Sequence, residues 1–163
     1  MAWMNQLGGL LQAYTGGAGE AGPERLARDW EQIYRFAPRE VLTQAVAHTF
    51  RSGGRPFPEQ VRAVVERIEG GRADILNILL APLPTAEAGE FRAEHRVLSD
   101  AEANLVVPKQ VEAMARNAEA RDPSIPDQVA ELLARHPTML ARAFSPQMLR
   151  AAIAWVAERA GAR

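Results

Sequence analysis

Apolar side chains recur at intervals of three and four residues along most of the chain. Val61, for example, is followed by Val64, Val65 and Ile68. This spacing places the apolar side chains on one face of an α-helix. No stretch sustains the two-residue alternation that is typical of a half-buried strand. The pattern therefore predicts an all-α fold.

Prolines mark where many of these helices begin. Seven of the 11 prolines are followed, three residues later, by valine or leucine, and six of them after Pro23 open a similar phrase. Proline suits the first turn of a helix, because the amide that it lacks has no intrahelical partner there. The intervals between these prolines are irregular, which favours a recurring helix start over a repeat array of fixed period. The six positions are Pro38, Pro58, Pro108, Pro126, Pro137 and Pro146.

Together these signals predict a bundle of seven to nine short helices, which could form two small helical subdomains. The first helix is marginal, because Gly8 and Gly9 each cost about 1 kcal/mol relative to alanine in a helix interior. Short polar side chains precede two of the later segments: Ser99 with Glu102 forms a capping-box pattern, and Ser145 is placed to cap the last helix. The predicted segments are residues 4–14, 23–36, 38–51, 58–69, 72–80, a turn from 99, 108–121, 124–135, 137–143 and 146–160.

Glycine and charge content divide the chain into four parts. Residues 1–22 end in a glycine-rich stretch and are predicted to be a flexible N-terminal segment. An N-terminal helical part (23–83) follows. Residues 84–98 are rich in charge and weak in periodicity, and are predicted to be a polar connector. A C-terminal helical part (99–163) completes the chain.

Composition narrows the class of protein. Of 163 residues, 47% are hydrophobic and 24% are charged, as in ordinary globular domains, and the net charge is −1. The absence of cysteine excludes disulfides, thiolate metal sites and cysteine nucleophiles. Residues 1–19 lack the basic start and continuous apolar run of a signal peptide, and no apolar stretch reaches the roughly 18 residues of a spanning helix. We expect a soluble, cytoplasmic protein without a membrane partner.

Side chains that could carry catalysis are scattered. The three histidines, His48, His95 and His136, do not have a metal-binding spacing. The glutamate pairs Glu66–Glu69 and Glu87–Glu90 lie beside arginines, as is typical of a solvated helix surface. The sequence therefore predicts no catalytic residue, no metal site and no cofactor, and favours a non-enzymatic protein.

Arginines make nucleic acid a candidate partner. Arg51, Arg55, Arg62 and Arg67 are concentrated in one helix–loop–helix region, and guanidinium groups bind phosphate. The joint between the two helices is longer than the turn of a helix-turn-helix unit, and nearby glutamates offset the positive charge. Nucleic-acid binding is therefore possible but not favoured.

The N-terminal segment is a candidate for binding another protein. Trp3, Leu7, Leu10 and Tyr14 lie on one face of the marginal first helix, and glycines follow that helix. Such a helix can dock into a groove on a partner or onto its own body. Both alternatives remain open from the sequence.

Short phrases distributed over most of the chain resemble a group of uncharacterised bacterial all-helical proteins of unknown function. Residues 81–98 depart from that group. The resemblance implies a bacterial, all-helical protein, and it carries over no activity and no site residue. The phrases are Asn5-Gln-Leu7, Leu11-Gln-Ala-Tyr14, Asp29-Trp-Glu-Gln-Ile33, Phe50-Arg51-Ser52 and Asp122-Pro-Ser-Ile125.

Three functions follow from these observations, in decreasing order of support. The first is a non-enzymatic protein–protein interaction or assembly protein, whose partner is another protein or a second copy of itself. The second is a DNA-associated helical protein. The third is an enzyme whose site the sequence does not reveal.

Overall fold

Ten α-helices make up the part of the chain that this computed structural model describes, residues 2–15, 22–52, 54–84 and 97–161; these ranges contain no strand. The all-α prediction is confirmed, and the number of helices is one above the predicted range. The helices are α1 (Ala2–Gln12), α2 (Pro23–Phe36), α3 (Arg39–Ser52), α4 (Phe57–Arg67), α5 (Arg72–Leu80), α7 (Asp100–Asn104), α8 (Pro108–Arg121), α9 (Ile125–Ala134), α10 (Pro137–Ala143) and α11 (Pro146–Gly161).

Prolines begin helices largely as the sequence predicts. Pro108, Pro137 and Pro146 are the first residues of α8, α10 and α11. Pro38 instead lies just before α3, where its carbonyl oxygen accepts a hydrogen bond from the amide of Leu42 at 3.2 Å. A residue in that place closes the first helical turn without needing an amide of its own.

Both predicted caps form. The amide of Ser99 donates to the Glu102 carboxylate at 3.0 Å, and the amide of Glu102 donates to the Ser99 hydroxyl at 3.2 Å. This reciprocal pair is the capping box of α7. At the start of α11, the Ser145 hydroxyl accepts from the amide of Met148 at 3.2 Å.

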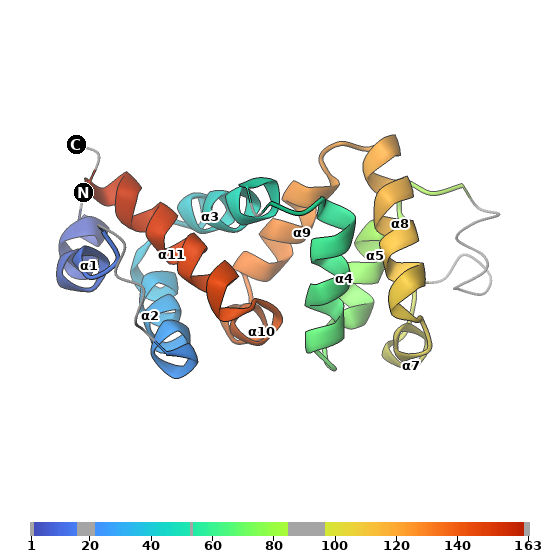
Figure 1. Cartoon of the computed structure of the whole chain (residues 1–163), viewed down its shortest axis with the longest axis horizontal. Helices are drawn as coiled ribbons and strands as arrows, with labels where there is room; N and C mark the ends of the chain where they lie inside the picture. The colour runs from blue at the N-terminus through green and yellow to red at the C-terminus, as the bar shows by residue number, and fades with distance from the viewer. Residues whose placement is uncertain (1, 16–21, 53, 85–96, 162–163) are drawn as a thin grey trace.

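The helices gather into two groups along the long axis of the molecule (Figure 1). One group holds α1, α2, α3, α10 and α11, and the other holds α4, α5, α7 and α8, with α9 between them in contact with α3 and α5. Each group combines helices from the predicted N-terminal and C-terminal parts, since α4 packs on α8 and α3 packs on α9 and α11. The two parts therefore share their buried surfaces.

Aromatic rings join the two groups in the core. Phe50 of α3 meets Phe57 of α4 and Phe144 edge to face, with ring centroids 5.4 and 5.8 Å apart. Buried Gln60 donates from Nε2 to the carbonyl oxygens of Phe50 (2.7 Å) and Arg55 (2.6 Å). These bonds give the buried side-chain amide of Gln60 its partners and attach the α3–α4 connection to α4.

Candidate functional site

A cleft of about 730 Å³ lies where the C-terminal end of α4 meets the junction between α9 and α10. One wall is formed by residues 67–70, and the other by residues 135–139 together with Arg142. Pockets that hold small ligands have volumes of about 300–1,000 Å³. The cleft is therefore large enough to enclose a small molecule or a short segment of another chain.

The lining is apolar at its base and basic at its mouth. Ile68 is buried, with 3% of its surface exposed, and Pro137 and Met139 are half-buried. The charged lining side chains are exposed to solvent, as is the imidazole of His136. They are Arg67, Glu69, Arg135 and Arg142.

Backbone contacts fix the first wall. The guanidinium of Arg72 donates from Nε to the carbonyl oxygens of Val65 (3.0 Å) and Ile68, and so closes the C-terminal end of α4. Gly71 then adopts φ = 92°, in the left-handed region that favours glycine. The sulfur of Met139 packs directly against this glycine. The residue that follows the first wall therefore touches the second wall.

The second wall is the tight turn from α9 into α10. The amide of His136 donates to the Leu133 carbonyl at 3.1 Å, and the His136 carbonyl accepts from Leu140 at 2.9 Å. From α2, the Tyr34 hydroxyl reaches the carbonyl oxygen of Arg135 at 3.5 Å. This turn directs the side chains of residues 135 and 136 away from the core.

Among the residues that the structure describes, no ion pair neutralises the positive charge of the cleft. Within the described ranges, no carboxylate lies at ion-pair distance from Arg67, Arg135 or Arg142. Glu69 is the one acidic residue among the described residues of the lining. Guanidinium groups that are not engaged in ion pairs can form bidentate hydrogen bonds to the carboxylates or phosphates of a ligand. The cleft is therefore suited to an anionic ligand.

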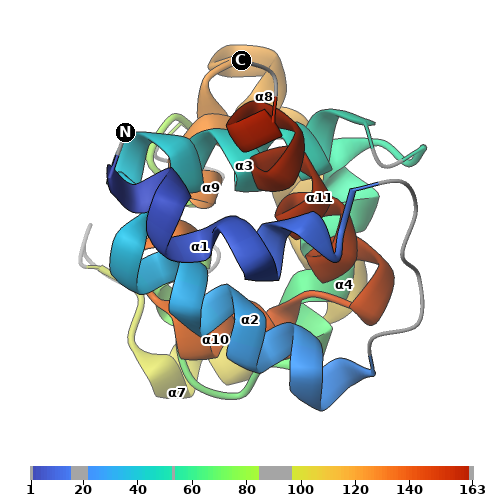
Figure 2. The same ribbon diagram turned by 90° about the vertical axis from the view of Figure 1, so that its left-hand side faces the viewer.

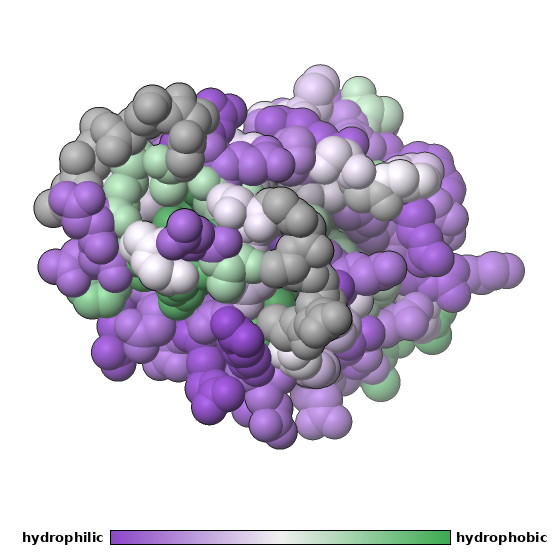
Figure 3. Space-filling view, turned by 60° about the vertical axis from the view of Figure 1, so that its left-hand side comes forward, coloured by the Kyte–Doolittle hydropathy of each residue, from purple (hydrophilic) through white to green (hydrophobic). Residues whose placement is uncertain are grey.

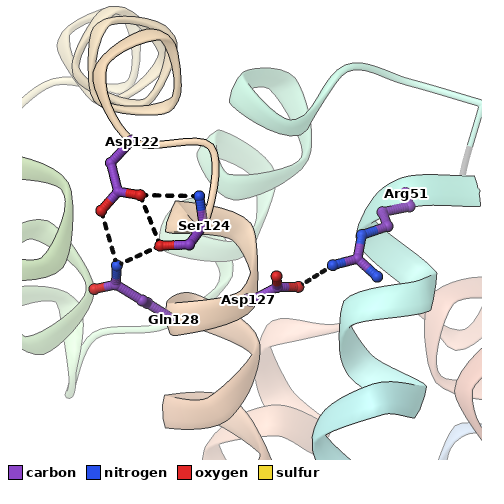
Figure 4. A network of polar contacts seen from close by, with 5 residues as sticks. All are labelled: Arg51, Asp122, Ser124, Asp127 and Gln128. Carbon is purple, nitrogen blue, oxygen red and sulfur yellow. Dashed lines mark hydrogen bonds and ion pairs between the residues drawn. The ribbon is translucent and has the colours of Figure 1, made fainter.

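Two of the four arginines predicted for nucleic acid are occupied by carboxylates. Arg51 pairs with Asp127 across the α3–α9 contact (Figure 4). Arg62 pairs with Glu66 at 3.0 Å and with Glu112 of α8 at 3.7 Å. Their charge is partly compensated within the protein.

The other two arginines do not lie together in one site. Arg67 lines the cleft, whereas exposed Arg55 belongs to the α3–α4 connection and is not part of the lining. The structure thus brings only one of the four predicted arginines into the cleft.

The predicted partner-binding face of α1 rests on the protein itself. Leu7 and Tyr14 are buried, with 2% and 5% of their surface exposed, and Trp3 and Leu10 are partly buried against the same core. α1 lies across α2 and α11 (Figure 2). On the face drawn in Figure 3, hydrophilic residues predominate and apolar ones show in smaller areas between them. The sequence left two alternatives open for α1, and the burial of its apolar face corresponds to docking onto the protein's own body.

A hydrogen bond anchors the end of this α1 segment. The hydroxyl of Tyr14 donates to Oδ2 of Asp29 in α2 at 2.5 Å, and Arg25 lies 3.6 Å from the same carboxylate oxygen. Burial, followed by the hydrogen bond to Asp29, raises the pKa of Tyr14 above its ordinary value. The bond therefore favours the neutral phenol in the folded protein.

The turn between α8 and α9 is held by a polar network (Figure 4). The Asp122 carboxylate accepts from the amide of Ser124 at 3.0 Å, from its hydroxyl at 2.7 Å and from Gln128 at 3.2 Å. These hydrogen bonds to Ser124 lower the pKa of Asp122. Each of these contacts is local, so the network stabilises the turn into α9.

The described part of the chain contains neither a group of histidines and carboxylates that could hold a metal ion nor a helix long and apolar enough to cross a bilayer. Exposed His48 lies beside Trp155, with ring centroids 6.1 Å apart. His136 is in the cleft, and His95 lies outside the described residues, as do Glu87 and Glu90.

Sequence reasoning did not identify Arg135, His136 and Arg142 as site residues. The sequence offers one signal for them, because arginines are frequent from residue 135 onward. Their relation to Arg67 arises from packing between helices about 70 residues apart in the sequence, and no local spacing encodes it.

Comparisons with known proteins return no match: no family model, no curated protein and no solved structure is similar to this chain. The resemblance to the bacterial group therefore stays a prediction, and the function has to be argued from the cleft.

Proposed function

We propose that this chain is a non-enzymatic interaction protein that binds a partner protein in the cleft between α4 and the α9–α10 junction. The observation that carries the proposal is the set of three arginines at the mouth of the cleft, which have no ion-pair partner among the described residues. We place the interaction in the bacterial cytoplasm, as the sequence predicts.

The lining suits a binding role. Exposed ion pairs contribute little individually, roughly 0–1 kcal/mol each, but several arginines beside a half-buried apolar base can act together. Complementary charge mainly accelerates encounter and selects the partner. The proposal therefore implies a reversible complex that weakens as the salt concentration rises.

Nucleic acid is the second candidate, and Arg55 and Arg67 favour it, because neither forms an ion pair with a described carboxylate. It has less support, because Arg51 and Arg62 are held by carboxylates of the protein. A nucleic-acid surface normally presents a continuous run of cations to successive phosphates.

A photo-cross-linking amino acid placed at Thr138 tests the proposal in living cells. Thr138 is an exposed lining residue, and exposed Asn117 of α8 is the matched control position outside the cleft. We expect protein adducts from position 138 that are absent from position 117 and that disappear in the double variant Arg135→Gln/Arg142→Gln. Nucleic-acid adducts at position 138 would support the second candidate, and identical adducts at both positions would overturn the proposal.

A further inference from the structure

The composition of the cleft lining constrains the chemistry of the segment that it binds, and this step rests on the proposed function. Three arginines and one glutamate surround the mouth, while Pro137 and Met139 supply half-buried apolar surface beneath them. A small, fully charged anion would leave that apolar surface in contact with water. A ligand with acidic and apolar groups would cover both.

Met139 is suited to contact an apolar side chain. Its sulfur is fixed on one side by Gly71, and part of the side chain faces the cleft. A thioether side chain is unbranched and polarizable, and it adapts to ligand surfaces of different shapes. This position therefore provides an apolar contact with little selectivity among large side chains.

The distribution of charge around the cleft argues against a long polyanion. Beyond the mouth, Arg62 and Arg116 both pair with Glu112, and Arg51 pairs with Asp127. Of the lining cations, Arg67, Arg135 and Arg142 have no ion-pair partner among the described residues, and they lie around a cleft of about 730 Å³. Glu69, inside the lining, can accept hydrogen bonds from peptide amides, which an oligonucleotide backbone does not offer.

We propose that the cleft binds a short acidic peptide segment of the partner protein, with one large apolar side chain between the acidic ones. The carboxylates contact Arg67, Arg135 and Arg142, and the apolar side chain packs against Met139 and Pro137. No covalent step is involved.

Fluorescence anisotropy with four labelled probes tests this inference on the full chain. The first probe is an eight-residue peptide of aspartate and glutamate with one central phenylalanine. The second replaces the phenylalanine by serine, and the third replaces the acids by their amides. The fourth is an oligothymidylate with the same number of negative charges as the first.

We expect the phenylalanine peptide to bind about fivefold more tightly than the serine peptide, and the amide peptide to bind at least tenfold more weakly. Arg142→Gln weakens binding of the first probe at least threefold. Arg121→Gln is the matched control, since Arg121 is exposed at the end of α8 and outside the lining, and it leaves the affinity unchanged. Thermal unfolding of both variants verifies that they are folded.

Equal affinity for the phenylalanine and serine peptides would overturn the apolar contact. Equal or tighter binding of the oligothymidylate would overturn the choice of a peptide. If Arg142→Gln and Arg121→Gln weaken binding of the first probe equally, the attraction is non-specific and the cleft is not the binding site. In each of these cases, cleft-specific protein adducts at position 138 would still support the proposed function, so the two failures can be distinguished.

Discussion

Two single residues, Gly71 beside the cleft and Tyr14 after α1, hold parts of the fold together through specific contacts. Gly71 combines a positive φ with a methionine sulfur placed where a side chain would otherwise begin. Tyr14 combines nearly complete burial with a hydrogen bond to a carboxylate. At both positions, adding or removing a single small group should change the free energy of unfolding. The contact responsible is one that no sequence pattern reveals.

Gly71→Ala should destabilise the protein by about 1–3 kcal/mol. Alanine disfavours the left-handed backbone conformation of this position, and its methyl group would collide with the sulfur of Met139. Gly70→Ala is the matched control, since a side chain there meets nothing within 4 Å, and its effect should stay within about 0.5 kcal/mol. Urea unfolding measures both values. Equal stabilities of the two variants would contradict the close contact between Gly71 and Met139.

Tyr14→Phe should lower the free energy of unfolding at pH 7 by about 1–2 kcal/mol, because it removes a hydrogen bond to a carboxylate. In the wild-type protein the pKa of Tyr14 is higher in the folded state than in the unfolded state. Its contribution is therefore complete below pH 10 and decreases as the pH rises above 10, where only the unfolded state ionises.

The difference in unfolding free energy between wild type and Tyr14→Phe should thus shrink between pH 9 and pH 11. Tyr34→Phe is the comparison, because its hydroxyl only reaches a backbone carbonyl at 3.5 Å, and its effect at pH 7 should be within about 0.5 kcal/mol. A difference for Tyr14→Phe that grows above pH 10 would contradict the raised pKa.

At the scale of helices, local chemistry was sufficient to predict where most elements begin. Proline at the first helical position and serine caps act within one turn, so the starts of α8, α10 and α11 and the capping box at Ser99 follow from a few adjacent residues. The cleft was not predictable in this way. Arg67 and Arg142 line the same cleft only because α4 packs against α10, and that packing depends on the whole core.

The turn between α8 and α9 depends on the Asp122 carboxylate. Asp122→Ala should lower the melting temperature, because the amide and hydroxyl of Ser124 lose their acceptor. Asp122→Asn is the matched control, since its side-chain oxygen can still accept from that amide, and it should lose less. An alanine variant as stable as the asparagine variant would show that the network does not hold the turn.

Acid should weaken this turn in the wild-type protein. The folded state lowers the pKa of Asp122, so its contribution is complete above the unfolded-state value near 3.8 and is lost as the pH falls through the folded-state value. Melting temperatures of wild type and Asp122→Ala should therefore converge below pH 3.8. A constant difference down to pH 2 would contradict this assignment.

At the scale of the whole molecule, the two halves of the sequence depend on each other. α3 and α4, from the first half, have their main neighbours in α9 and α8, from the second. A fragment of residues 1–84 would expose the faces that α8, α9 and α11 cover, and a fragment of residues 97–163 would expose the complementary faces. A fragment that leaves these apolar faces in water loses the burial of apolar surface, which is the main favourable contribution to folding.

Each fragment alone should therefore show reduced helicity and no cooperative thermal unfolding by circular dichroism. Mixed in equal amounts, the two should recover most of the helicity of the intact chain and co-elute in gel filtration as one 1:1 complex. The intact protein is the reference for both measurements. Cooperative unfolding of either fragment by itself would show that the shared core is not required, because an independent domain retains its stability when its neighbour is removed.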